Sequence, residues 1–296
     1  MSTPAYVVVT PSRNEEEHLQ RTIDSMVEQT LRPQKWIIVN DGSTDKSGEI
    51  IDRAARENPW IKALHRADRG FRKAGGGVIE AFYDGYAVLG AEGWDFIVKL
   101  DGDLSFAPSY FADCLERFRH DDKIGIGGGT ICSAASGGHD PESQGDPPFH
   151  VRGATKIYRR ACWEAIGGLL KAPGWDTVDE VKANMLGWTT CSFPDMKVTH
   201  YRFAGDADGS WKNWVKNGRA NYITGYHPAF MLFKCVSRLM ERPRGVAAAG
   251  LFWGFFGGYF QNVPQVEDRD LIKYLRQQQI RRLTFRDSLW TRGTRR

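Results

Sequence analysis

The chain has 296 residues, of which 41% are hydrophobic and 26% charged, proportions that are ordinary for a soluble globular α/β protein. From Glu267 to Arg296, nine Lys and Arg stand against four Asp and Glu, so this tail carries +5 and the remainder −1. This distribution excludes a nucleic-acid surface spread over the whole protein. Five cysteines without Cys-x-x-Cys spacing disfavour a disulfide framework or a zinc site, and no signal peptide is visible, so we expect a cytoplasmic protein.

The first hundred residues alternate between strand and helix patterns. Short apolar runs predict strands at Tyr6–Thr10, Lys35–Asn40, Ile61–His65 and Trp94–Leu100. Helical spacing predicts helices at Glu16–Gln29, Asp45–Arg56 and Val78–Leu89, with Ser43 or Thr44 as the cap of the second. This alternation predicts right-handed crossovers and a mostly parallel sheet with helices on both faces.

Polar loops follow all four predicted strands, starting at Pro11, Asp41, Arg66 and Asp101. In parallel sheets the ligand binds beyond the carboxyl ends of the strands, so these loops should converge on one edge. The most informative of them is Asp101-Gly102-Asp103, because two carboxylates one residue apart can meet one hard cation. A surface Asp-Gly turn is the alternative for this motif taken alone.

The next hundred residues continue the alternation. We predict helices at Pro108–His120, Tyr158–Ile166 and Thr177–Leu186, and strands at Ile124–Ser133 and Thr189–His200. Three consecutive glycines at 127–129 indicate a bulge or a close backbone approach. Thr177 and Glu180 have the spacing of a capping box, which explains Glu180 by capping.

The ordered set of motifs resembles the family 2 glycosyltransferases of the GT-A fold over roughly residues 5 to 202. The motifs are Pro11-Ser12-Arg13-Asn14-Glu15, Asn40-Asp41-Gly42-Ser43-Thr44-Asp45, Asp101-Gly102-Asp103, Trp175-Asp176-Thr177 before Gly187-Trp188, and Val198-Thr199-His200. The resemblance implies a catalytic domain at 1–204, with a nucleotide-sugar half at 1–104 and an acceptor half at 105–204. Residues 205–296 would form a C-terminal helical extension.

The resemblance also implies roles for individual residues. Thr10, Pro11 and Glu15 match the first nucleotide loop, and Asp41 matches the residue that binds the base. Arg72 and Lys73 would meet the nucleotide or the diphosphate, with a solvated basic loop as the competing interpretation. Asp101 and Gly102 would contact the nucleotide sugar, and Asp101, Asp103 and His200 would hold Mn²⁺ or Mg²⁺ against the diphosphate.

A base must take a proton from the acceptor hydroxyl. The family base is the Asp of a Glu-Asp pair, and Asp176 matches it, although Trp175 replaces the usual Glu. Asp179 is the second candidate, and the helix dipole favours it at that place whatever its role.

The resemblance implies an inverting glycosyltransferase that moves a sugar from a UDP-sugar donor to a hydroxyl of a lipid-linked or polysaccharide-precursor acceptor. Lys216-Asn217-Gly218-Arg219-Ala220 stands where processive synthases of the family carry Gln-x-x-Arg-Trp, so we expect a non-processive enzyme. The alternatives are a polyprenyl-phosphate glycosyltransferase and a nucleotidyltransferase of similar sheet topology. Gly245–Val266 has no charged residue, and apolar aromatics beside Arg238, Arg242 and Arg244 suit an anionic membrane. We therefore expect peripheral contact with the cytoplasmic face of the membrane through 226–263 and the basic tail. A buried helix pair or an oligomer interface is the alternative, and no nucleic-acid partner is expected.

Overall fold

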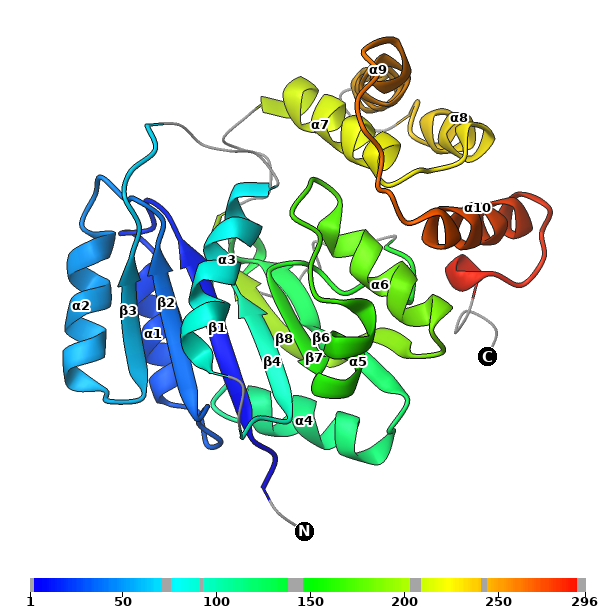
Figure 1. The fold of residues 1–296 in the computed structure, drawn as a ribbon. Helices are drawn as coiled ribbons and strands as arrows, with labels where there is room; N and C mark the ends of the chain where they lie inside the picture. Colours follow the sequence, from blue (N-terminus) through cyan, green and yellow to red (C-terminus); the bar gives the residue numbers. More distant parts are fainter. Residues whose placement is uncertain are drawn as a thin grey trace.

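A computed structural model describes residues 3–70, 76–90, 93–137, 146–202, 209–240 and 244–291 of the chain. Within this part lies an eight-stranded sheet with the order β3-β2-β1-β4-β7-β6-β8-β5 (Figure 1). Its strands are β1 (Tyr6–Ser12), β2 (Lys35–Asn40), β3 (Ile61–His65), β4 (Phe96–Leu100), β5 (Leu104–Phe106), β6 (Ile124–Ser133), β7 (Thr155–Arg159) and β8 (Thr189–His200). The neighbours from β3 to β4 are parallel, β6 is parallel to β8, and β7 and β5 run antiparallel to their partners.

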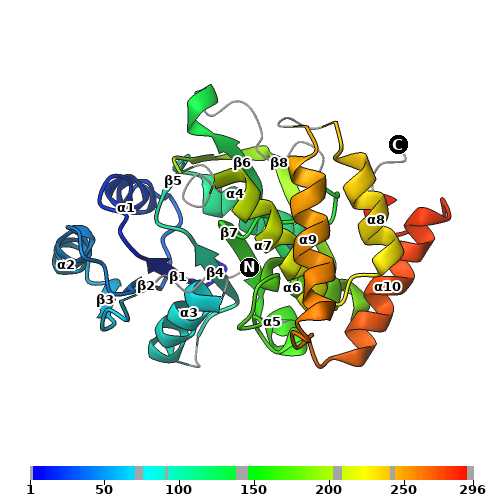
Figure 2. The ribbon, with the colours of Figure 1, turned by 90° about the horizontal axis from the view of Figure 1, so that it is seen from above.

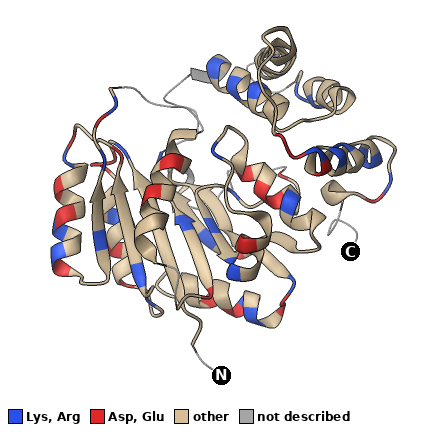
Figure 3. Cartoon of the chain, in the orientation of Figure 1, with Lys and Arg blue, Asp and Glu red and all other residues tan. Residues whose placement is uncertain are grey.

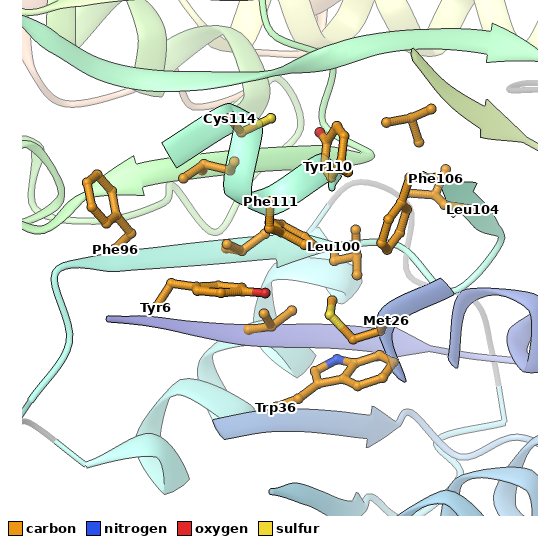
Figure 4. Packing of buried hydrophobic residues seen from close by; sticks show 14 of the residues in the cluster. Tyr6, Met26, Trp36, Phe96, Leu100, Leu104, Phe106, Tyr110, Phe111 and Cys114 are labelled. Atoms are coloured by element: carbon orange, nitrogen blue, oxygen red, sulfur yellow. The ribbon is translucent and has the colours of Figure 1, made fainter. Parts of the chain in front are cut away.

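Helices cover both faces of this sheet. One core lies between the sheet and α1 (Leu19–Val27), α2 (Ser47–Glu57) and α4 (Tyr110–His120), and Figure 4 shows part of it around Tyr6, Trp36 and Phe111. The opposite face packs against α3 (Gly76–Leu89), α5 (Arg160–Ile166) and α6 (Trp175–Met185). The central strands β1 and β4 are buried along their whole length, which is why most of their residues are apolar. The predicted α/β fold with a mainly parallel sheet is therefore confirmed.

The glycine run in β6 marks a close backbone approach, as predicted. A Cβ atom on Gly128 would lie 2.5 Å from the carbonyl oxygen of Thr155, and one on Gly129 would lie 2.3 Å from that of Met196. The β6–β8 register also shifts between Gly129 and Thr130. Only glycine fits at this irregularity, because any larger side chain would overlap the neighbouring backbone.

One predicted helix was wrong at its start. The segment predicted as a helix from Tyr158 begins with strand β7, and α5 follows only from Arg160. β7 pairs with β4 and β6, so its residues from 155 to 158 are buried, and tertiary pairing overrides the local pattern. The three-residue strand β5 was not predicted either.

Both predicted helix caps were wrong. The residue that caps α2 is Lys46, while the Ser43 hydroxyl accepts a hydrogen bond from the Asn14 backbone in the loop after β1. The helix α6 begins two residues before Thr177, after Gly174 in a left-handed conformation (φ +87°). Glu180 is therefore no capping residue, and its contacts lie in a buried cluster described below.

The C-terminal part forms a separate layer of helices, namely α7 (Gly209–Ile223), α8 (Pro228–Ser237), α9 (Val246–Phe260) and α10 (Arg269–Leu283). Figures 1 and 2 show these helices gathered beyond α6, away from α1 and α2. Their apolar core continues onto Val178 and Val181 of α6. The backbones of α7 and α9 touch, because a Cβ atom on Gly254 would lie 2.0 Å from the Val215 carbonyl oxygen. Among the described helices, none combines the length and hydropathy needed to cross a bilayer.

Candidate active site

The carboxyl ends of β1, β2 and β4 meet around Ser12. The backbone of Asp41 donates a hydrogen bond to the Ser12 carbonyl oxygen (2.8 Å). A Cβ atom on Gly102 would lie 3.5 Å from Ser12 Oγ and 3.1 Å from Leu19. The Ser12 hydroxyl is buried and has no hydrogen-bond partner among the described residues. Ser12 thus joins the Asp41 loop to the Asp101–Asp103 motif, so the two motifs share one edge of the sheet.

Hydrogen bonds from backbone N–H groups to side-chain oxygens connect the loops after β1 and β2. Asn14, in a left-handed conformation (φ 53°), accepts a hydrogen bond from the Thr44 backbone at 2.9 Å through its side-chain oxygen. The Glu15 backbone donates to Ser47 Oγ at 2.8 Å. These bonds give the edge its shape before any ligand arrives, which lowers the entropy cost of binding.

Two arginines hold the carboxylate of Asp41. Arg66 Nη1 lies 2.5 Å from Oδ1, and Arg69 Nη2 lies 2.6 Å from Oδ2. Arg13 donates to the Asp41 backbone oxygen and forms a 2.7 Å ion pair with Asp68. Arg66 also forms a 2.7 Å ion pair with Asp84. Two guanidinium groups therefore bind the buried Asp41 carboxylate and a third binds its backbone, in a network where three arginines meet three carboxylates.

The carboxylate of Asp101 is bound by Lys99, a residue of the same strand. Lys99 Nζ donates to Asp101 Oδ1 and also to the Gly153 carbonyl oxygen at 2.6 Å. Lys99 is 2% exposed, whereas the Asp101 side chain is 31% exposed. Burial raises the pKa of Asp101, Lys99 opposes that shift, and Asp103 adds to it.

Asp103 and His200 form the closest match to a metal-binding pair. His200 Nε2 lies 3.3 Å from Asp103 Oδ2, and both side chains are about nine-tenths buried. Asp103 Oδ1 is buried without a hydrogen-bond partner in the part of the chain that the structure describes. A buried carboxylate oxygen without a partner is costly, which fits a position that a cation completes. In the described ranges, no set of three or more His, Cys, Asp or Glu side chains could hold a metal ion. Mg²⁺ is usually bound by one or two carboxylates together with waters and substrate phosphates.

The segment after β8 closes this edge from the other side. Arg202 forms a 2.8 Å ion pair with Glu15 and donates to the Asn14 backbone oxygen at 2.9 Å. Tyr201 stacks on His18, and its backbone N–H donates to the Asp103 carbonyl oxygen at 3.0 Å. Residues almost two hundred positions apart in the sequence therefore border the same site.

The first turn of α6 carries Asp176, and it is anchored by a second buried lysine. Lys156 Nζ donates a hydrogen bond to the Asp176 backbone oxygen at 2.6 Å. The Asp176 carboxylate takes no part in this bond, and the residue is half-buried. The Trp175 ring lies 5.5 Å from Lys156 Nζ and 5.3 Å from Lys99 Nζ. The turn that holds Asp176 thus contacts the lysine that binds Asp101.

Asp179 and Glu180 lie in a buried cluster below this turn. Asp179 is 2% exposed, lies 3.0 Å from Lys156 Nζ, and accepts a 2.6 Å hydrogen bond from the Tyr158 hydroxyl. Burial raises the pKa of Asp179 to about 6, Lys156 opposes the shift, and Glu180 adds to it. Glu180 lies 2.7 Å from Lys156 and 2.9 Å from His150, and this carboxylate raises the pKa of His150 against the effect of burial.

The predicted site residues thus fall into three groups. One group borders a single edge of the sheet and consists of Glu15, Asp41, Asp101, Gly102, Asp103 and His200. Asp176 is connected to this edge through Trp175 and Lys99. Thr10 and Pro11 are buried within β1, where the Thr10 hydroxyl accepts a hydrogen bond from the indole of Trp36. Arg72 and Lys73 lie outside the described residues.

Several residues of this edge were missed by the sequence interpretation. Lys99 stands out as a charged residue within the apolar run of β4, a signal that could have identified it. Arg66 and Arg69 belong to the basic loop from which only Arg72 and Lys73 were chosen. Ser12 lies within the quoted Pro11–Glu15 motif but was not chosen from it, and Arg202 carries no local signal because its significance comes from its partner Glu15, far away in the sequence.

The Glycosyl transferase family 2 profile matches residues 7–168, which is more than half of the chain. The protein belongs to glycosyltransferase family 2. Within this family, the chain is 33% identical over 113 residues to the poly-beta-1,6-N-acetyl-D-glucosamine synthase of Staphylococcus aureus (strain COL), covering 38% of this chain and 25% of the relative. The matched segments span between 11% and 50% of the length of the curated relatives.

Solved structures support the GT-A-like fold. The mannosyltransferase PcManGT from Pyrobaculum calidifontis, solved with GDP-Man and Mn²⁺, has a TM-score of 0.55 at 16% identity, over 92% of this chain and 79% of that one. S. aureus TarS 1-349 with UDP-GlcNAc has a TM-score of 0.52 at 16% identity, over 94% and 81%. Membership of family 2 places this chain among the glycosyltransferases.

Proposed function

We propose that this glycosyltransferase moves a sugar from a UDP-sugar, with inversion and one sugar at a time, to a hydroxyl of a lipid-linked or polysaccharide-precursor acceptor. The observation that carries the proposal is the Asp103–His200 pair, whose unpartnered carboxylate oxygen lies on the same sheet edge as the arginine-bound Asp41. One solved neighbour holds GDP-Man and another holds UDP-GlcNAc. The sugar of the second is the one named in the similar poly-beta-1,6-N-acetyl-D-glucosamine synthase, which supports a UDP-sugar as the donor.

In this proposal each part of the edge has a separate task. Asp41 binds the base, and Arg66 and Arg69 orient it and attract the diphosphate. Asp103 and His200 hold Mn²⁺ or Mg²⁺, which supplies positive charge to the leaving diphosphate. Asp176 takes the proton of the acceptor hydroxyl as that oxygen attacks the anomeric carbon. A single displacement with one base inverts the configuration at that carbon.

The donor assignment is tested by mixing the protein with UDP-, GDP- and dTDP-sugars and Mn²⁺ and measuring release of each nucleotide diphosphate. We expect UDP release from one UDP-sugar, abolished by EDTA and restored by Mn²⁺. Release of pyrophosphate from a nucleoside triphosphate and a sugar phosphate would instead favour the nucleotidyltransferase alternative. Absence of any nucleotide release, with or without lipid acceptors, would contradict the proposal.

We further propose that the C-terminal helices place the enzyme on the cytoplasmic face of an anionic membrane, close to its acceptor. In and just after α8, large apolar side chains are exposed at the spacing i, i+1, i+4, i+7 and i+8, which places them on one face of a helix. Four of the same five positions are exposed and apolar in α9, and α8 packs against α9. They are Leu232, Phe233, Val236, Leu239 and Met240 in the first stretch and Phe252, Trp253, Tyr259 and Phe260 in the second.

Charge around this exposed face suits an anionic surface. Residues 209–266 contain seven Lys and Arg and one acidic residue. Figure 3 shows basic residues along α7 and α10, whereas α9 carries none. An apolar face of this size bordered by cations is typical of peripheral membrane binding, because aromatics enter the interface while cations meet lipid phosphates.

The proposed membrane contact predicts that removing two exposed aromatic side chains of α9 lowers the affinity for anionic vesicles. Exchanging Trp253 and Phe260, which are 66% and 87% exposed, for serine should weaken binding to phosphatidylglycerol vesicles at least about tenfold, since each buried aromatic contributes roughly 1.5–3 kcal/mol. Sedimentation with vesicles measures this affinity. The control is Val88→Ser, which removes an exposed apolar residue of α3 and should change nothing. If the unmodified enzyme ignores these vesicles and is a dimer that the double variant dissociates, the face is an oligomer interface instead.

A further inference from the structure

Lys99 is the most unusual residue near the proposed metal site. It is the fourth of the five residues of the buried strand β4, with 2% exposure, and the other four are apolar. Burying an ammonium group is costly unless it is paired and hydrogen-bonded. The contacts of Lys99 are therefore specific: the carboxylate of Asp101, the carbonyl oxygen of Gly153 at 2.6 Å, and the face of Trp175 at 5.3 Å.

These contacts connect two segments of the site that are far apart in sequence. Asp101 belongs to the motif at the end of β4, and its backbone N–H donates to the Ala154 carbonyl oxygen at 2.8 Å. A Cβ atom on Gly153 would lie 3.0 Å from the Trp175 ring and 3.5 Å from the Asp176 side chain. The ammonium of Lys99 therefore lies between the Asp101 carboxylate and the start of α6.

The neighbouring Lys156 shows that these lysines have different tasks. Lys99 and Lys156 are paired positions of β4 and β7, and both lie against the Trp175 ring. Lys156 binds Asp179, Glu180 and the Asp176 backbone, so it stabilises the base of α6. Lys99, by contrast, forms an ion pair with Asp101, the first carboxylate of the Asp-Gly-Asp motif.

We propose that Lys99 is a positioning residue that neutralises Asp101 and holds it away from the divalent cation, so that Asp103 is the carboxylate through which the motif binds metal. The inference rests on the proposed function, since it concerns the same metal site. Asp103 differs from Asp101 in having an oxygen that is buried without a hydrogen-bond partner among the described residues.

The physical consequence is a metal site of limited affinity in the absence of nucleotide. The Lys99 ammonium competes for Asp101 and repels a divalent cation held by the neighbouring Asp103. Charges interact more strongly where water is largely excluded, so the effect of one buried ammonium on a neighbouring cation is large. Removing that charge should release Asp101 as an additional ligand.

The test is the affinity of the protein for Mn²⁺ alone, measured by electron paramagnetic resonance of unbound Mn²⁺. Lys99→Met should bind Mn²⁺ at least about tenfold more tightly than the unmodified protein, because a repelling charge is lost and a carboxylate is gained. The matched control is Lys35→Met. Lys35 begins β2 at the opposite end of the sheet and donates to the Leu89 carbonyl oxygen, so its loss should leave Mn²⁺ affinity unchanged.

Each outcome decides the inference. Unchanged or weaker Mn²⁺ binding by a folded Lys99→Met variant, with its fold checked by near-ultraviolet circular dichroism, would overturn it. A lysine that merely stabilised β4 would lower the melting temperature without raising metal affinity. If neither protein binds Mn²⁺ while UDP release continues in EDTA, the metal site itself fails and the inference with it. The glycosyltransfer proposal would then stand without a metal.

Discussion

Replacing Asp176 with asparagine should leave donor binding unchanged and lower the rate of sugar transfer by about 10²- to 10⁴-fold, the usual contribution of a general base. Asparagine keeps the size of the side chain but accepts no proton. The fold should persist, because the contact that anchors this turn runs from Lys156 to the Asp176 backbone oxygen. Transfer is measured as acceptor-dependent UDP release, and donor binding by calorimetry with the UDP-sugar.

Asp179→Asn is the matched comparison for the second candidate base. Asp179 is buried and bound by Lys156 and Tyr158, so its loss would leave the lysine charge partly unpaired. Breaking a buried ion pair costs about 3–5 kcal/mol, and we expect a lower melting temperature as the main effect. Near-normal transfer by Asp176→Asn, or loss of transfer by Asp179→Asn at an unchanged melting temperature, would move the role to Asp179.

Replacing Asp103 with asparagine should abolish measurable Mn²⁺ binding and lower UDP release by at least about 10²-fold, the scale found when a group that stabilises developing negative charge is removed. The reason is that asparagine carries no charge and offers one oxygen, in a place where a buried oxygen already lacks a partner in the described chain. Paramagnetic resonance of Mn²⁺ and UDP release at saturating donor measure the two effects.

The control for Asp103 is Asp95→Asn at the other end of the same strand. Asp95 immediately precedes β4 and accepts a hydrogen bond from the Ala5 backbone at the amino edge of the sheet. We expect this variant to keep Mn²⁺ binding and turnover. Retention of metal-dependent turnover in Asp103→Asn would refute the metal assignment, whereas equal losses in both variants would point to a general effect on the strand.

The sequence by itself determined the parallel strands of the first hundred residues, the polar motifs at their carboxyl ends and the resemblance to the family. Apolar runs at β1, β2 and β4 and the polar motifs after them depend on local patterns, which the chain displays directly. The same holds for the glycine run of β6, since close packing of backbone leaves only one residue type possible.

The tertiary structure alone decided which charges meet. Glu180 matched a capping box, yet it pairs with Lys156 and His150. The last two residues of β7 were predicted as the start of a helix, yet they belong to a strand that pairs with β4 and β6. Asp101 and Asp103 look equivalent in sequence, but Lys99 binds the first, and the second faces His200 from a strand almost a hundred residues away. Local patterns reflect the propensities of neighbouring residues. Ionic partners depend on which distant segments the fold brings together, and pairing is required there because an unpaired charge in the low-dielectric interior is costly.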